Sequence, residues 1–321
     1  MTSPLLNLPG AVAAEGRDEG VAAHYGELYG EQRALADGRG FVDLSHRGVI
    51  TVSGPERLSW LHLLLTQHLT ELPAGQATEA LILSANGHIE HALYLVDDGE
   101  TVWAHVEPGT QEALLAYLES MKFFYRVETA DRTGEFAVVH LPAGSTAEVA
   151  KEHAVRETPY GRDVFLPRAE LETFAAAHGP AAGLDAYEAL RVEAHRPRLG
   201  AETDHRTIPH ELGWIGTAVH LQKGCYRGQE TVARVHNLGK PPRRLVFLHL
   251  DGSDVLLPPH GTPVRLAADG AEGRQLGFVT TAVRHHELGP IALALVKRNV
   301  AVDAQLLAGT IAAAQEVVVA P

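Results

Sequence analysis

The feature that most constrains the fold is an abrupt change of pattern at residues 239–242, which read Gly-Lys-Pro-Pro. Beyond this point the sequence contains short apolar runs separated by Gly, Pro and Asp, such as LVFLHLDG, QLGFVTTAVRH and PIALALVKR. Runs of this length joined by turn residues are typical of β-strands, and the 3.6-residue apolar repeat of a helix is absent from them. The pattern predicts a separate all-β domain, a small barrel or sandwich, over residues 243–321.

The preceding segment, residues 41–242, mixes helix and strand patterns and predicts an α+β region of two subdomains. A Pro and a Glu in the stretch SGPE favour a helix start, and the apolar repeat that follows predicts a helix over 55–69. The residues Ala-Asn-Gly at 85–87 predict the turn of a β-hairpin. We expect residues 1–40 to be a partly disordered leader without a secretory signal, because they lack a basic start and a continuous apolar stretch.

Composition excludes several classes of protein. The chain has 321 residues, 27 Lys plus Arg against 40 Asp plus Glu, and a formal net charge of −13, which argues against nucleic-acid or anionic-membrane binding. We find no apolar run long enough to span a membrane. A single cysteine excludes an intrachain disulfide and an iron–sulfur cluster held by this chain's thiolates alone. The expected compartment is therefore a reducing cytoplasm.

Familiar catalytic motifs are missing from the sequence. The 19 histidines include no HExxH pair or facial triad, so we interpret them as surface or locally bonded residues and expect no metal site. The sequence also lacks GxGxxG, GxxxxGK[ST] and GxSxG.

The stretch KGCYRGQE contains the only cysteine, Cys225, between Lys223 and Arg227. Nearby cations and a helix N-terminus lower the pKa of a thiol, and a helix is predicted to start at Gly228 with Gln229 in its first turn. One hypothesis is an electropositive loop that holds an anionic ligand or keeps the thiol partly ionised. The other is a buried cysteine chosen for its size, with solvated cations around it. The spacing alone leaves both open.

A second cluster of charges, RVEAHRPRLG, ends a helix that we expect to stop near Pro197. Within it, Glu193 is an isolated acid among bases and could accept hydrogen bonds from the N–H groups of a heterocycle. The alternative is a solvated helix end.

With these segments in view, KGCYRGQETVAR resembles the signature of the YgfZ folate-binding proteins. These are paralogues of the glycine-cleavage T-protein (aminomethyltransferase) and relatives of the Caf17-type iron–sulfur assembly factors. The segments VDLSHRGVITVSG, YLESMKFFYRVE, LRVEAHRPRLG with IPHELGW, and LGFVTTAVRHHELGPIALALV resemble the same family. The resemblance covers the chain from Phe41 to its last residue.

This resemblance implies a T-protein-like ring of domains around a tetrahydrofolate-sized pocket. It also implies that Glu193 reads the pterin and that Cys225 is the functional thiol. The folate-binding residues that it implies are Arg191, Glu193, Lys223, Arg227, Gly228, Gln229 and Arg234.

Two positions depart from the T-protein pattern. The resemblance places His91 and Ala92 where the T-protein has adjacent aspartates, one of them catalytic, so aminomethyl transfer needs a substitute base such as His91 or Glu90. It also places His195 where the T-protein has a glycine.

Three functional hypotheses follow from the resemblance and these departures. The first is a tetrahydrofolate-binding accessory protein that supports assembly or repair of [4Fe–4S] enzymes, including tRNA-modifying ones, through Cys225 and through protein partners. The second is a folate-dependent aminomethyl or methyl (C1) transferase. The third is an interaction protein with a vestigial pocket.

Overall fold

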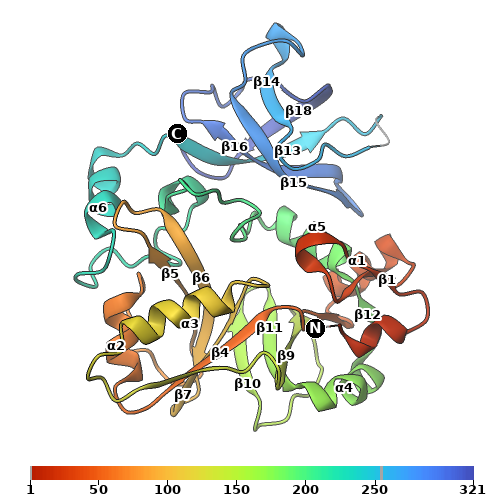
Figure 1. Ribbon diagram of the computed structural model, residues 1–321. Helices are drawn as coiled ribbons and strands as arrows, with labels where there is room; N and C mark the ends of the chain where they lie inside the picture. The colour runs from red at the N-terminus through yellow and green to blue at the C-terminus, as the bar shows by residue number, and fades with distance from the viewer. Residues whose placement is uncertain (1, 254–255) are drawn as a thin grey trace. The chain divides into compact units, whose positions relative to one another are not determined.

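The computed structural model describes residues 2–253 and 256–321 (Figure 1). The chain divides into two compact units. The first comprises residues 1–82, 91–187 and 222–226, and the second comprises residues 83–90, 188–221 and 227–321. The predicted α+β region followed by an all-β barrel is confirmed. The predicted boundary after residue 242 stays a prediction: strand β13 begins at Arg243, but the second unit also takes in segments before it.

One five-stranded sheet of the first unit has the order β5-β6-β7-β4-β8. Its strands are β5 (Ala77–Leu83), β6 (Ile89–Asp97), β7 (Thr101–Val106), β4 (Gly48–Ser53) and β8 (Glu128–Asp131). Helices α2 (Arg57–Leu64) and α3 (Gln111–Ser120) bury Trp60, Leu61, Leu114 and Leu118 against this sheet. The predicted hairpin is confirmed, because the turn at 85–87 joins β5 to β6.

The predicted helix over 55–69 is too long. Helix α2 ends at Leu64, and Leu65 has an extended backbone. The backbone N–H of Thr66 donates to the carbonyl of Leu81 at 3.0 Å, so the chain follows β5 where the apolar repeat predicted another helical turn. Leu65 and Leu69 are still buried, which explains why the spacing misled the prediction.

The other sheet of this unit has the order β10-β11-β9-β3-β12. Its strands are β10 (Ala154–Thr158), β11 (Gly161–Pro167), β9 (Phe136–Pro142), β3 (Phe41–Asp43) and β12 (Ala181–Ala182). Turn η3 (Arg168–Glu170) and helix α4 (Leu171–His178) follow β11. The pair β3–β12 is parallel and the remaining pairs are antiparallel.

Residues 2–40 hold secondary structure where a partly disordered leader was expected. The elements are η1 (Pro4–Asn7), β1 (Val12–Ala13), η2 (Gly16–Asp18), β2 (Ala22–His24) and α1 (Leu28–Ala36). Leu5 is buried in one apolar cluster with Phe41. The carboxylate of Glu31 accepts hydrogen bonds from the backbone N–H groups of Tyr25 and Gly183, both at distances below 3 Å. These long-range contacts anchor a segment whose composition alone looks loosely ordered.

The second unit contains a closed antiparallel barrel with the strand order β13-β16-β15-β14-β17-β18. Its strands are β13 (Arg243–Leu250), β16 (Gly289–Lys297), β15 (Gly277–His285), β14 (Pro263–Leu266), β17 (Leu306–Ala308) and β18 (Ile311–Val317), with turn η5 (Ala267–Asp269) after β14. Because β13 pairs with both β16 and β18, the sheet has no open edge.

Two helices and one turn complete the fold outside the sheets. Helix α5 (Leu184–Glu193) runs from the first unit into the second, and η4 (Pro209–Leu212) and α6 (Gln229–Leu238) lie in the second. Helix α5 ends four residues before Pro197, so the proline does not set its end. His195 has φ +54°, a left-handed conformation that favours glycine and cannot continue a helix.

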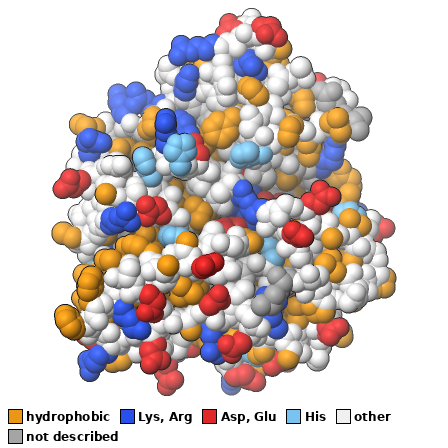
Figure 2. Space-filling model, in the orientation of Figure 1, with side chains coloured by type: hydrophobic (Ala, Val, Ile, Leu, Met, Phe, Trp, Pro, Cys, Tyr) orange, Lys and Arg blue, Asp and Glu red, His pale blue; other side chains and the backbone are white. Residues whose placement is uncertain are grey.

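Large hydrophobic side chains are exposed at one part of the first unit. They include Leu63 on α2 and the neighbours Phe123 and Phe124 in the loop after α3. In Figure 2, hydrophobic side chains gather over this part of the molecule. In the part of the chain that the structure describes, no helix is long and apolar enough to cross a membrane.

Candidate functional site

The thiol of Cys225 is exposed. The hypothesis that this cysteine fills a buried space is therefore wrong. Its neighbours Lys223 and Tyr226 are buried instead, which anchors the loop on either side of the thiol. The loop thus presents the one sulfur nucleophile of the chain to solvent.

Lys223 holds this loop against helix α2 through hydrogen bonds. Its ammonium donates a hydrogen bond to the carbonyl of Leu65 at 2.6 Å and another to the carbonyl of His62, both at the C-terminal end of α2. Free carbonyls and the negative end of the helix dipole make this position favourable for a cation. Burial lowers the pKa of Lys223 to about 8, with the Cys225 thiol acting in the opposite direction. Lys223 is therefore a brace, and its donors already bond carbonyls of the protein.

His62 on α2 also bonds the cysteine loop, in the opposite direction. The backbone N–H of Leu69 donates to Nδ1 of His62 at 3.2 Å, so the ring proton is on Nε2. That Nε2–H lies 3.0 Å from the carbonyl oxygen of Lys223 and donates to it. The cysteine loop and α2 are therefore joined by hydrogen bonds in both directions.

On the other side of the cysteine, Arg227 pairs with Glu90, since Nη1 lies 2.8 Å from the carboxylate. Both side chains are partly exposed. Gly228 then starts α6 as predicted, with φ +84°. A Cβ on Gly228 would lie 2.6 Å from the carbonyl oxygen of Ser84, so glycine is needed for the close approach to the hairpin turn. Gln229 is the first residue of α6, and Arg234 is exposed further along it.

Glu193 is the last residue of α5, and 44% of its side chain is exposed. Its carboxylate oxygen lies 3.2 Å from Nε2 of the buried His285, at the end of β15. The acid is therefore neither isolated nor only solvated, because one side contacts the barrel and the other is open.

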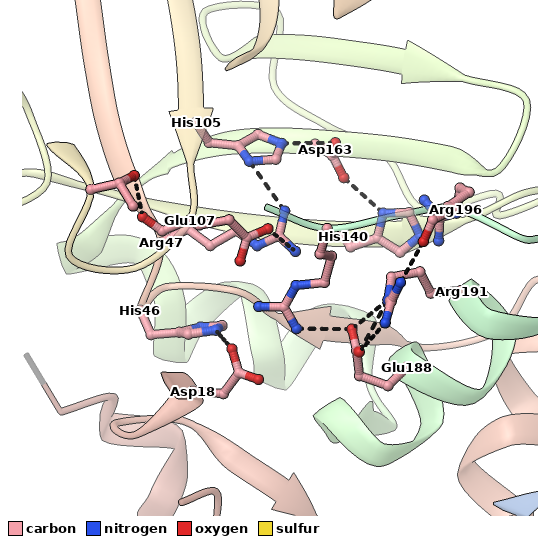
Figure 3. A network of polar contacts seen from close by, with 12 residues as sticks. Asp18, His46, Arg47, His105, Glu107, His140, Asp163, Glu188, Arg191 and Arg196 are labelled. Atoms are coloured by element: carbon pink, nitrogen blue, oxygen red, sulfur yellow. Dashed lines mark hydrogen bonds and ion pairs between the residues drawn. The ribbon is translucent and has the colours of Figure 1, made fainter. Parts of the chain in front are cut away.

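Arg191 is not free to bind a ligand, which corrects its predicted role. Its Nε donates to Glu188 at 3.0 Å, Nη1 donates to Glu202 at 3.0 Å and to the carbonyl of Arg196, and Nη2 donates to Glu188 at 2.8 Å and to Thr281 at 3.2 Å. All five N–H donors of the guanidinium are thus used by protein acceptors. Figure 3 shows Arg191 with Glu188 and Arg196. Arg191 ties α5 to β15 and supports Glu193 indirectly.

Sequence reasoning missed a buried polar cluster in the first unit. Asp163 on β11 accepts hydrogen bonds from Nδ1 of His140 at 2.8 Å and Nε2 of His105 at 3.1 Å (Figure 3). It also accepts one from Nη1 of Arg156 at 2.9 Å. Arg47 donates to Nδ1 of His105 at 3.3 Å, so His105 carries its proton on Nε2 and is neutral. A charged residue inside the apolar run RDVFLP was the available sign of this cluster.

The pKa values of this cluster follow from its burial. Burial lowers the pKa of His105 to about 4, although the carboxylate of Asp163 acts in the opposite direction. Burial alone would raise the pKa of Asp163, but the hydrogen bonds that His105 and His140 donate hold it well below its usual range. The cluster is a carboxylate held by donors from His105, His140 and Arg156, which makes it a rigid support between strands β7, β9, β10 and β11.

The residues at 90–92, where the resemblance suggested a departure from the T-protein, lie at the start of β6. Ala92 is buried in β6, and His91 is partly exposed beside Glu90. Glu90 is therefore the carboxylate at this end of β6. Among the described residues, no group of three His, Cys, Asp or Glu side chains could hold a metal ion.

A separate cavity of about 370 Å³ lies in the first unit, over α4. Its lining includes Val149, His153, Leu166, Glu170 and Phe174, and none of the predicted site residues. Its wall is mainly apolar, and we assign it no part in the chemistry below.

Comparison with known proteins finds two family models that match parts of this chain. Residues 21–158 match the family model of the GCVT N-terminal domain, and residues 243–319 match that of the glycine cleavage T-protein C-terminal barrel domain. A solved structure, the glycine cleavage system aminomethyltransferase T from Bartonella henselae, has the same fold, with a TM-score of 0.80 at 20% identity over 98% of this chain and 94% of that chain.

Two relatives of this chain are named aminomethyltransferases. The chain is 28% identical over 312 residues to an aminomethyltransferase of Herpetosiphon aurantiacus, across 86% of this chain and 84% of the relative. It is 29% identical over 309 residues to an aminomethyltransferase of Rubrobacter xylanophilus, across 86% and 81%. The chain thus contains one region similar to the GCVT N-terminal domain and another similar to the glycine cleavage T-protein C-terminal barrel domain.

Proposed function

We propose that this chain binds tetrahydrofolate and acts as a folate-dependent one-carbon transferase of the aminomethyl or methyl type. The observation that carries this proposal is the likeness to aminomethyltransferases along most of both chains, including both domains. An accessory role was the first hypothesis from the sequence, but these relatives favour the transferase.

Glu193 is the residue that we propose to read the pterin. A carboxylate accepts two adjacent N–H groups of a planar heterocycle, and that of Glu193 is half exposed at the end of a rigid helix. Gly228, Gln229 and the exposed cation Arg234 stay proposed ligand-binding residues on the α6 side. Lys223 and Arg227 enter the proposal only as residues that brace the loop.

Glu90 is the acid or base that we propose in place of the T-protein aspartate. It is a partly exposed carboxylate next to the expected position, and Arg227 at 2.8 Å holds it as an ion pair. General acid–base transfer requires a carboxylate with access to the reacting group, and exposure at the end of β6 provides that access. His91 is the alternative base.

The thiol supports a second candidate function. Cys225 is exposed on a loop that is braced at Lys223, an arrangement suited to a thiol that meets another protein. On this basis the chain would be an accessory protein of the YgfZ type that serves iron–sulfur enzymes, including tRNA-modifying ones. Any cluster would be shared with a partner, because one thiolate cannot hold it. A free thiol also fits the reducing cytoplasm that we propose as its compartment.

Calorimetric titration with tetrahydrofolate and turnover assays separate these proposals. The transferase predicts binding by the wild-type protein and release of tetrahydrofolate from methylenetetrahydrofolate when ammonia and a dithiol are supplied as acceptors. Glu90→Gln should abolish the release and keep the binding. Binding without turnover, together with failure of Cys225→Ala to restore iron–sulfur enzyme activity in a deletion strain, would favour the accessory protein. No binding at all would refute both.

A further inference from the structure

The contact between Glu193 and His285 joins two residues that are far apart in the sequence. Glu193 ends α5, and His285 ends β15 of the barrel. Their side chains approach to 3.2 Å between Oε2 and Nε2. His285 is buried, whereas Glu193 is half exposed, so the imidazole faces the carboxylate from the protein side.

The turn between β15 and β16 fixes the proton of this imidazole. The backbone N–H groups of Glu287 and Leu288 both point at Nδ1 of His285, at 3.2 and 3.1 Å. Because Nδ1 accepts these hydrogen bonds, the ring proton is on Nε2, the atom that faces Glu193. The ring can neither change tautomer nor take a second proton without breaking these two contacts.

Among the described residues, the Nε2–H group donates a hydrogen bond to no other acceptor. It is buried and meets no acceptor at a hydrogen-bonding angle, although the Glu193 carboxylate lies within hydrogen-bonding distance. A buried donor without an aligned acceptor costs about 1–3 kcal/mol. A small rotation of the Glu193 side chain would align the two groups, and a ligand that fixes Glu193 would select that rotation.

Two further histidines close to this pair in the sequence make contacts of their own. Nε2 of His286 lies 3.8 Å from the carboxylate of Glu287, its neighbour in the turn. The ring of His195 packs against Phe247, with centroids 4.8 Å apart. Burial lowers the pKa of His285, and His286 adds to this while Glu193 acts in the opposite direction, so the His285 ring is neutral at pH 7.

We propose that His285 is a positioning residue for ligand recognition: its Nε2–H bonds one lone pair of a Glu193 oxygen and thereby fixes the plane in which the carboxylate accepts the N–H groups of the pterin. The inference rests on the proposed folate binding and adds a residue from the barrel to it. His285 touches no ligand itself. It sets the orientation of the acid that does.

The test compares variants that keep or remove the donor. In His285→Gln the side-chain amide places an N–H near the position of Nε2, whereas His285→Leu fills the space without a donor. Glu193→Gln removes the recognised charge. His249→Leu is the matched control, because His249 also pairs with a carboxylate of this barrel, Glu316 at 2.7 Å, but not with Glu193. Thermal unfolding first verifies that each variant is folded.

Calorimetric titration with 5-formyltetrahydrofolate, a stable folate, should give a clear order. We expect His285→Leu to weaken binding by about ten- to hundredfold, as for a lost hydrogen bond to a charged group. His285→Gln should stay within about threefold of wild type, His249→Leu should match wild type, and Glu193→Gln with His285→Leu should bind no more weakly than Glu193→Gln alone. Wild-type affinity in His285→Leu, beside a loss in Glu193→Gln, would overturn the inference and leave the folate proposal intact.

A second measurement does not depend on folate. The ¹⁵N shifts of the His285 ring should show a proton on Nε2 and should change in Glu193→Gln but not in Glu316→Gln. A proton on Nδ1, or a ring signal indifferent to Glu193, would overturn the inference even if folate binds. Absence of folate binding by the wild type, with the ring signal as expected, would refute the proposed function and with it the role of this contact in recognition.

Discussion

Replacing Gly228 by alanine should destabilise the second unit through a contact that the structure defines. Gly228 is the N-cap of α6 and has φ +84°, whereas Gly239 is its C-cap and has φ +70°. Both positions are left-handed, but their surroundings differ. A Cβ at Gly228 would lie 2.6 Å from the carbonyl oxygen of Ser84 and 3.0 Å from Cα of Gly87, whereas a Cβ at Gly239 would meet nothing within 4 Å.

Comparing Gly228→Ala with Gly239→Ala separates the free-energy cost of a left-handed backbone from that of a steric clash. A left-handed backbone costs an L-residue about 1–2 kcal/mol, and Gly239→Ala should show this alone. Gly228→Ala adds a clash with backbone atoms of the hairpin turn, which cannot rotate away. Overpacking of a tight contact typically adds about 1–3 kcal/mol. We therefore expect Gly228→Ala to lower the free energy of unfolding by about 3 kcal/mol, roughly twice the effect of Gly239→Ala.

Urea unfolding followed by far-UV circular dichroism measures the two losses, and hydrogen exchange of the α6 amides assigns them to this unit. The hairpin carries Glu90, so Gly228→Ala should also disturb the Arg227–Glu90 ion pair, whereas Gly239→Ala should not. Equal losses in the two variants would refute the reasoning, because they would show that α6 does not approach the hairpin turn as closely as the structure indicates.

Four further predictions concern charge and the thiol. Because burial lowers the pKa of Lys223 to about 8 in the folded chain from its usual 10.5, wild-type stability should rise between pH 8 and about pH 10.5, and urea midpoints of Lys223→Met should lack this rise. Asp163→Asn should cost about 3 kcal/mol in urea unfolding, because the buried Arg156 loses the carboxylate at 2.9 Å and keeps only that of the partly exposed Glu79 at 3.2 Å. The folded-state pKa of His105 is about 4, below its usual 6.5, so its contribution to stability should be lost as the pH falls from about 6.5 to 4, and thermal unfolding in this range should show the decline. Cys225→Ser should change stability by less than about 0.5 kcal/mol, and the native wild type should titrate one thiol with a disulfide reagent; a thiol that reacts only after unfolding would contradict its exposure.

Local patterns in the sequence determined much of the architecture. The Pro-Pro pair and the short apolar runs after it predicted a barrel, and β13 begins at the next residue, Arg243. The Asn-Gly turn predicted the hairpin of β5 and β6, and Gly228 predicted the start of α6. These features were readable because each depends on residues within a few positions of one another, where backbone geometry and apolar period leave few choices.

Contacts between distant residues decided the rest. In the sequence, Lys223 and Cys225 belong to the same short loop, and nothing local tells which of them is buried. In the structure, Lys223 is buried against carbonyls of α2 and Cys225 is exposed. Arg191 looked available to a ligand until its five donors met acceptors from α5, the following loop and β15. Such pairings depend on which strands and helices lie side by side, and no local pattern encodes them.

The candidate site shows the same division. The sequence by itself identified Glu193 as an acid among bases and Cys225 as the single thiol. Only the tertiary structure brought His285, from a strand of the barrel, to 3.2 Å from Glu193. The physical reason is that the charge and the hydrogen-bonding groups of a residue are properties of its side chain, whereas the partner that orients them is set by the packing of elements remote in the chain.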